Sequence, residues 1–236
     1  MAILIADDSR NKQTLNGTNV KHFLMPYLEG YAAGKNLLVS QVRTKYLLWV
    51  DDYFEFTRGT ILERLLEKLE SPTAELDVVA GFISDHKGGV SDTINNDPWK
   101  WLKYSRDPDG NGCIVRTETS FPYGTVERFP NCAFKDVVPN FFMAKTESLR
   151  KVGFDSTFEQ VAHHELFIDG WGYLKIVQCD DVTILHDRSK SIVESTFINH
   201  HFSEEELVEH SDHVLFKNGL ENFQSWNPHY FGKRRN

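Results

Sequence analysis

Acidic side chains stand in pairs at two places where an apolar segment ends. Asp7 and Asp8 follow one near-continuous apolar run, and Asp51 and Asp52 follow another. In an open α/β sheet, ligands bind beyond the carboxyl ends of the strands, where carboxylate oxygens can bind a ribose hydroxyl or a hard cation. Aspartate is also common in turns that follow strands. Because the pair occurs twice, each time after an apolar run, we predict a functional site at this edge of the sheet.

Three further residues have side chains suited to the same site. Lys35 lies near the start of an expected helix and could face a pyrophosphate, although a solvated surface lysine is the alternative. Glu165 is a candidate general base, because a carboxylate beside a sugar hydroxyl can remove its proton; the alternative is an ordinary surface glutamate. His186 ends an expected strand and could bind a metal ion, although a lone histidine is often structural.

The apolar pattern predicts the elements that position these side chains. The expected strands are 2–6, 20–25, 45–50, 76–83, 137–144, 173–177 and 182–185, and the expected helices are 31–43, 61–69, 146–151 and 204–215. Thr60 and Glu63 form a capping-box signature, and 163–170 suits either a short helix or a loop. The turn-rich segment 84–128 predicts an irregular insertion with one or two hairpins. Strands that alternate with helices predict an α/β fold with a mainly parallel open sheet.

Composition narrows the classes of partner. The formal net charge of −8 argues against nucleic acid, which demands a concentrated basic face. An anionic nucleotide would then need local positive charge from a metal ion, a basic side chain or helix N-termini. No apolar run reaches membrane-spanning length and no signal peptide opens the chain, so we expect any anchor to lie outside this sequence. The sequon at 16–18 is compatible with a secretory lumen.

Two ordered sets of segments resemble a known family. The first set resembles the nucleotide-binding half of family 2-like glycosyltransferases with a GT-A fold: Ile5-Ala-Asp-Asp-Ser9, Gly34-Lys-Asn36 and Thr44-Lys-Tyr-Leu-Leu-Trp-Val-Asp-Asp52. The second resembles the beta-1,4-N-acetylgalactosaminyltransferases that make ganglioside-type glycans: Val138-Pro-Asn-Phe-Phe-Met-Ala-Lys145, Val152-Gly-Phe-Asp155 and Ala162-His-His-Glu-Leu-Phe-Ile-Asp-Gly-Trp-Gly172. The resemblance runs from about Ile3 to His186, and the tail beyond Lys190 is not covered. We therefore expect a catalytic domain over 1–190 and a C-terminal tail of unknown role over 191–236.

The resemblance implies an inverting transfer of a sugar, with N-acetylgalactosamine expected, from a UDP donor to a glycan or glycolipid acceptor in the Golgi. It assigns these roles: Asp7 and Asp8 to the uridine, Lys35, Asn36 and Asp51 to the nucleotide, Asp51 and Asp52 as the DxD element to Mn²⁺ or Mg²⁺, His186 to the same metal, and Glu165 to general base.

The sequence departs from the family pattern in two ways. Tyr53 stands where a third acid is usual, and a neutral phenol is a poor ligand for these cations, so either Asp51 and Asp52 suffice, Glu55 compensates, or metal binding is weak or absent. The strand and helix that normally open a GT-A core also have no counterpart before Ile3, so we expect an exposed apolar flank there.

Two other functions remain open. A non-catalytic relative that binds nucleotide or glycan agrees with Tyr53 and with the short N-terminus. A glycoside hydrolase would need two acids that flank one bond, and it has no need for acidic pairs at strand ends.

The chain has three cysteines, so at most one internal pair can form. In a lumenal protein, we expect the pair to be Cys132 with Cys179, because both lie in the half of the chain that carries the second set of segments.

Overall fold

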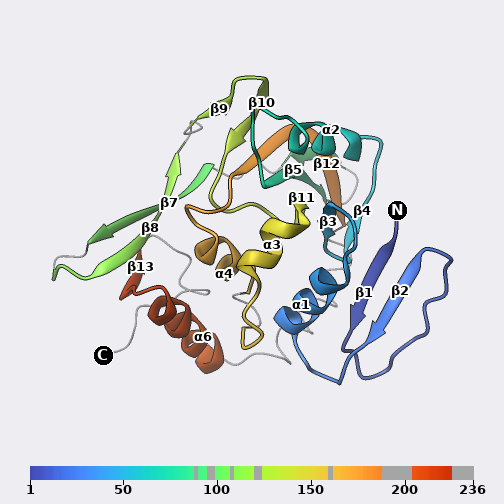
Figure 1. Cartoon of the computed structure of the whole chain (residues 1–236), viewed down its shortest axis with the longest axis horizontal. Helices are drawn as coiled ribbons and strands as arrows, with labels where there is room; N and C mark the ends of the chain where they lie inside the picture. The colour runs from blue at the N-terminus through green and yellow to red at the C-terminus, as the bar shows by residue number, and fades with distance from the viewer. Residues whose placement is uncertain are drawn as a thin grey trace.

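The computed structural model describes residues 1–87, 90–94, 99–106, 109–119, 124–158, 162–187 and 204–224. Its central sheet has the strand order β3 (Tyr46–Val50), β11 (Phe141–Lys145), β5 (Val78–Lys87), β12 (Ile176–Asp187), β10 (Phe129–Phe134) and β9 (Thr125–Val126), with β4 (Phe54–Glu55) beside β12 and β6 (Val90–Ile94) beside β5. Two smaller sheets consist of β1 (Ile3–Asp7) with β2 (Val20–Leu24), and of β7 (Trp99–Arg106), β8 (Gly112–Thr119) and β13 (Asn222–Gln224). The expected α/β class is confirmed (Figure 1).

Strand direction in the central sheet differs from the prediction of a mainly parallel sheet. Among the described pairs of this sheet only β5 and β12 run parallel; β11, for example, is antiparallel to both β3 and β5. The error has a physical cause. A strand buried on both faces gives the same apolar run whichever way it points, so the pattern reveals that a strand exists but not its direction.

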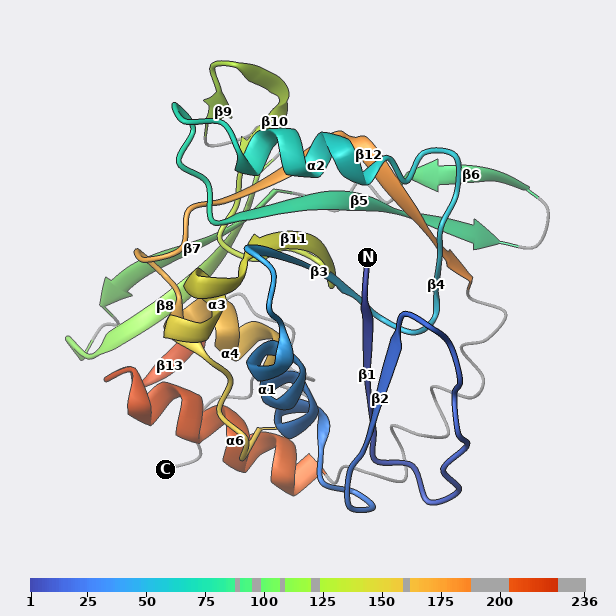
Figure 2. The ribbon, with the colours of Figure 1, turned by 45° about the vertical axis from the view of Figure 1, so that its right-hand side comes forward.

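Helices cover both faces of the central sheet (Figure 2). One face carries α1 (Tyr31–Gln41), α3 (Thr146–Val152), α4 (Ala162–Asp169) and α6 (Glu204–Lys217), and the other carries α2 (Leu62–Leu69). Strand β11 shows how one sequence serves both layers: Phe142 and Ala144 pack with the first group of helices, whereas Phe141 and Met143 pack on the side of α2. This alternation follows from the two-residue period of a strand.

Several local expectations are confirmed, and three are wrong. Segment 163–170 is mostly helical, in α4, and β7 and β8 form an antiparallel hairpin within the turn-rich insertion. The capping box does not form: Ile61 takes the N-cap position, and Thr60 Oγ1 instead accepts from the Thr57 amide at 2.9 Å while its hydroxyl donates to the carbonyl oxygen of Thr183 at 2.7 Å. Residues 137–140 and 173–175, both expected in strands, lie outside any strand. Residues 182–185 belong to the long β12, whose pairing with β5 shifts register between Gln178 and Thr183.

The N-terminal strands stand apart from the central sheet. Within the described residues, β1 pairs with β2 in parallel and is not hydrogen-bonded to β3. Ile3 in β1 is 46% exposed, in agreement with the expected apolar flank. The expected boundary at 190 falls outside the described residues, but Val214 and Leu215 of α6 are buried in the same core as α1 and α4. No described helix has the length and apolarity that a bilayer crossing requires.

A disulfide joins Cys132 to Cys179, as expected from the sequence. The two residues lie opposite each other on β10 and β12, and the remaining thiol, Cys113, is buried. Because the bridge closes a loop between residues 47 apart, it restricts the unfolded chain strongly.

We expect the double variant Cys132→Ala/Cys179→Ala to lose about 2–4 kcal/mol of unfolding free energy, since its unfolded chain regains the entropy of the open loop. Denaturant titration measures this loss. Thiol titration of the unfolded parent protein is the companion experiment: one reactive thiol agrees with the bridge, and three would contradict it.

Candidate functional site

The loop after β1 holds the first acidic pair through backbone contacts. Asp8 accepts a hydrogen bond at 3.0 Å from the amide of Gly30, the residue that precedes α1. Gly30 has a φ of 106°, a conformation that favours glycine. Asp7 accepts from the amide of Ser9 at 2.9 Å and lies 3.1 Å from Nε2 of His22. The hydrogen bonds from Ser9, with the contact to His22, together outweigh desolvation and lower the pKa of Asp7, so this carboxylate is ionised at neutral pH.

Asp51, directly after β3, is the centre of a cluster of hydroxyl groups. Its two carboxylate oxygens accept from Tyr53 at 2.8 Å and from Tyr31 at 3.2 Å. Tyr31 in turn accepts from the side-chain amide of Asn140 at 3.0 Å. Burial raises the pKa of Asp51, and these donors together with the charge of Lys35 oppose the rise. Because Tyr31 follows Gly30 in the chain, the first turn of α1 connects Asp8 to Asp51.

Lys35 is buried inside the protein, so the alternative that it is a solvated surface lysine is wrong. Its residue is 2% exposed, and Nζ lies 4.0 Å from the ring centroid of Tyr31, with the rings of Trp49 and Phe154 at 5.2 and 5.1 Å. Burial lowers the pKa of Lys35 to about 7, while the charges of Asp51 and Glu165 act in the opposite direction. Lys35 therefore links the two acids electrostatically, and rings favour its charged form through cation–π contacts.

Glu165 in α4 is also buried, with 1% of its residue exposed. Oε1 accepts from the amide of Asp155 at 3.3 Å and from Lys217 of α6. Burial raises the pKa of Glu165 to about 7, since desolvation and Asp169 together outweigh the effect of Lys217. A carboxyl group with this pKa can both take and release a proton at neutral pH, which is what general base catalysis requires.

Asp51, Asp52 and His186, the three residues that the family resemblance assigns to a metal ion, have different surroundings in the structure. Asp52 is exposed. His186 in β12 packs its ring against Tyr53 at a centroid distance of 5.0 Å, and the Tyr53 hydroxyl contacts Asp51. In the described part of the chain, the three residues do not bring three ligand atoms within 4.8 Å of one another; the one group that does is Cys132, Cys179 and Asp181, whose two cysteines form the disulfide.

Asn36 lies one residue beyond Lys35 but makes structural contacts. Its side-chain amide donates to the carbonyl oxygen of Phe154, and its Oδ1 accepts from the Phe154 amide at 3.0 Å. Asn36 therefore ties α1 to the segment between α3 and α4. Through this tie the Phe154 ring is held beside Lys35.

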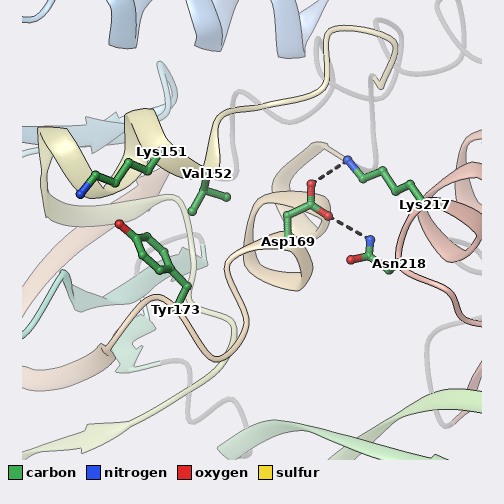
Figure 3. Close-up of a pocket in the computed structure, with 6 residues that line it drawn as sticks. All are labelled: Lys151, Val152, Asp169, Tyr173, Lys217 and Asn218. Atoms are coloured by element: carbon green, nitrogen blue, oxygen red, sulfur yellow. Dashed lines mark hydrogen bonds and ion pairs between the residues drawn. The ribbon is translucent and has the colours of Figure 1, made fainter.

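A pocket of about 440 Å³ lies beside Glu165 and is lined in part by Asp169 and Lys217, two residues that act on that carboxyl group. Figure 3 shows it between α3, α4 and α6, with Asp169 and Lys217 on one wall and Tyr173 and Lys151 on the other. Its lining does not include Asp8, Asp51 or Glu165. The pocket is thus next to Glu165 without being the place where the acidic pairs meet.

The sequence did not single out three residues that contact the proposed acids or their partners: Tyr31 and Asn140 in the group around Asp51, and Lys217 beside Glu165. Asn140 lies within a segment that carries the family resemblance, so that segment was a usable signal. Tyr31 had none, because tyrosine at a helix start indicates no specific role. Lys217 ends an amphipathic helix, where a basic residue is common for reasons of helix stability alone.

Comparison with known proteins supplies close sequence relatives. The chain is 42% identical over 186 residues to human beta-1,4 N-acetylgalactosaminyltransferase 1, a match that covers 79% of this chain and 33% of the relative. Mouse beta-1,4 N-acetylgalactosaminyltransferase 2 is 39% identical over 187 residues, with 79% and 34% covered. The chain therefore spans about a third of the length of these relatives. No protein-family model matches it.

Solved structures agree on the fold. Staphylococcus aureus TarS (residues 1–349) in complex with UDP has a TM-score of 0.58 at 13% identity, covering 92% of this chain and 55% of that one. GalNAc-T7 with UDP, GalNAc and Mn²⁺ also has a TM-score of 0.58 at 13% identity, covering 79% and 37%. The chain thus has the GT-A glycosyltransferase fold and is homologous to a segment of the beta-1,4-N-acetylgalactosaminyltransferases.

Proposed function

We propose that this chain forms the catalytic core of an inverting glycosyltransferase that moves N-acetylgalactosamine from a UDP donor to a glycan acceptor. One observation carries the proposal: three acids that are far apart in sequence interact with the start of α1. Asp8 accepts from the Gly30 amide and Asp51 from the Tyr31 hydroxyl, and Asp51 and Glu165 both act on the charge of Lys35. Homology to N-acetylgalactosaminyltransferases supports the donor sugar, and a GT-A neighbour crystallised with UDP supports the nucleotide.

In this proposal, the nucleotide lies along the edge formed by the two acidic pairs. Asp7 and Asp8 contact the uridine, and Asp51 and Lys35 act near the diphosphate. Lys35 is buried among aromatic rings, so it acts through its charge unless the site opens when the nucleotide binds. Asn36 contributes indirectly, because its side chain is engaged with the Phe154 backbone.

The donor chemistry around Asp51 fits a divalent cation. Carboxylate oxygens and an imidazole nitrogen are suitable ligands for Mn²⁺, and each Asp51 oxygen that accepts from a tyrosine retains a further lone pair. We propose that Asp51 and Asp52 hold the ion, with His186 as a further ligand. When bound, such an ion supplies Lewis-acid stabilisation of the charge on the departing diphosphate.

Glu165 has the role of general base. Its carboxylate takes the proton from an acceptor hydroxyl while that oxygen attacks the anomeric carbon, and the bond from that carbon to the diphosphate breaks. A single displacement of this kind inverts the anomeric configuration. Burial in the apolar interior raises the pKa of Glu165 into the range where this proton transfer is efficient.

The direct test is an assay of UDP release from UDP-N-acetylgalactosamine with candidate glycan acceptors, with Mn²⁺ and with a chelator. We expect acceptor-stimulated UDP release that requires the metal ion. Tight UDP binding without turnover on any acceptor would instead identify a non-catalytic nucleotide-binding relative. The contact between Tyr53 and Asp51 is the observation that favours this second function, because a phenol stands where a third acid would complete the metal site.

Tyr53→Asp is expected to strengthen Mn²⁺ binding by about tenfold or more, since it places a third carboxylate next to Asp51. Tyr53→Phe is the matched control, because it also removes the hydrogen bond to Asp51 but adds no charge. Calorimetric titration with Mn²⁺ in the presence of UDP measures both variants. Equal Mn²⁺ affinity in the two would show that position 53 does not limit the metal site.

We also propose that the protein works in an oxidising lumen, with the Golgi as the expected compartment. The bridge between Cys132 and Cys179 supports this location, since disulfides persist in oxidising compartments. Asn16 of the sequon is exposed, as glycosylation there requires.

A further inference from the structure

Lys217, the last residue of α6, ends in a group of three carboxylates. Its Nζ lies 2.7 Å from Oδ2 of Asp169 and 3.7 Å from Oδ2 of Asp155, and it contacts Oε1 of Glu165. Figure 3 shows this side chain reaching from α6 towards Asp169 on α4. The tail that carries Lys217 lies beyond the segments that resemble the transferase family.

The two carboxylate oxygens of Glu165 have different hydrogen-bonding surroundings. Oε1 receives the hydrogen bonds from Lys217 and from the Asp155 amide. Oε2 is buried and has no hydrogen-bond partner among the described atoms. A buried oxygen without a partner is costly, and in a native protein a catalytic role is one of the explanations for such an atom.

The C-terminal segment holds Lys217 in place. Val214 and Leu215 are 0% and 1% exposed, so α6 is fixed to the core directly before Lys217. Asn218, directly after it, donates to Oδ1 of Asp169 and to the carbonyl oxygen of Val214, both at 2.9 Å. The lysine is therefore positioned by ordered neighbours on both sides in sequence.

We infer that Lys217 is a positioning residue for Glu165: it holds Oε1 and so leaves Oε2 to accept the proton of the acceptor hydroxyl. The inference rests on the proposed function. Asp169 accepts from Lys217 and Asn218 together, which fixes the lysine between the two carboxylates of α4.

Several other charged and titratable groups near Glu165 also determine how it responds to pH. Lys217, Asp169, Lys35 and the Asp155 amide act on Glu165 directly. His163 and His164 precede it on α4, and His213 on α6 acts on Asp155. Lys217 lowers the pKa of Glu165 and Asp169 raises it. The two neighbours therefore predict pH shifts of opposite sign when they are neutralised.

Lys217→Met is expected to move the acidic limb of the kcat/KM profile upward by about one pH unit or more, because an opposite charge at this distance lowers a carboxyl pKa by that amount. Below pH 6 this corresponds to a loss of about tenfold, which shrinks at alkaline pH. Asp169→Asn should move the limb downward, and Lys217→Arg should restore most of the parent profile. Lys151→Met is the control: it removes a lysine from the same pocket, and it should leave the limb in place.

Uniform loss of activity at every pH in Lys217→Met, with an unmoved limb, would overturn the inference and indicate a structural role. A second readout separates this inference from the proposed function. In protein labelled with carbon-13 glutamate, the Glu165 side-chain resonance is assigned by its loss in Glu165→Gln, and its titration midpoint should rise in Lys217→Met and fall in Asp169→Asn. Unchanged midpoints would refute the positioning role. Absence of transfer by the parent protein, with shifted midpoints, would refute only the transferase proposal.

Discussion

Glu165→Gln is expected to reduce the turnover number for sugar transfer by about 10²–10⁴-fold, the range that a general base contributes. The amide has the same shape as the carboxyl group but cannot accept a proton at neutral pH. Lys217 keeps its contacts with Asp169 and Asp155 in this variant, so the C-terminal helix should remain docked. Initial rates at saturating donor and acceptor measure the loss.

UDP affinity should be almost unchanged in Glu165→Gln, because the proposed base acts on the acceptor. Glu147→Gln is the matched control, since Glu147 is an exposed glutamate on the neighbouring helix α3. A variant at 165 that retains parental turnover would eliminate Glu165 as the base.

The pH dependence of the parent protein provides a consistent check on Glu165. The pKa of its carboxyl group is raised to about 7, so kcat/KM should increase as pH rises through that value and the base loses its proton. Lys35 changes in the opposite sense: its pKa is lowered to about 7, so its positive charge is lost as pH rises through the same region.

Asp51→Asn is expected to weaken metal-dependent UDP binding by about 10²-fold or more, because loss of a residue that only supports a metal ligand already costs about 10–100-fold in metal affinity. Asp51 is proposed as a metal ligand, and its charge raises the pKa of Lys35 more than that of Glu165 does. Without that charge the pKa of Lys35 falls further, and the lysine becomes neutral at physiological pH. Two favourable charges for a metal–diphosphate complex are therefore lost through one substitution.

Calorimetric titration with UDP, in Mn²⁺ and in chelator, separates the metal-dependent part of the UDP affinity from the part that does not need the metal ion. The metal-dependent part of the affinity should disappear in Asp51→Asn, whereas Asp180→Asn, which alters an exposed aspartate in β12, should bind as the parent does. Parental Mn²⁺ dependence in Asp51→Asn would remove Asp51 from the proposed metal site.

The sequence predicted elements better than their arrangement. The runs that became β1, β3 and β11 were recognisable because both faces of the strands are apolar. Their pairing was not, because an apolar run contains no information on direction or neighbours. The Thr60 capping box failed because Ile61, one residue later, is the N-cap of the helix and the Thr60 oxygen accepts from the Thr57 amide instead.

The candidate site was predicted in part. Acidic pairs at strand ends identified Asp8 and Asp51 from the residues alone, and the family resemblance added specific roles for Glu165 and Lys35. The structure adds what no pattern contains: burial of Lys35 among aromatic rings, and the approach of Lys217 from a tail that carries no recognisable motif. Contacts of this kind depend on packing between distant segments, so a single sequence does not reveal them.

A crystal structure with UDP and Mn²⁺ tests the central claim most directly, namely that Asp8, Asp51 and Glu165 surround one nucleotide-sugar site. We predict uridine beside Asp8, the metal ion on Asp51 with the diphosphate, and the β-phosphate on the side that faces Glu165. Nucleotide bound elsewhere on the protein, with Asp8 and Asp51 away from it, would contradict this account.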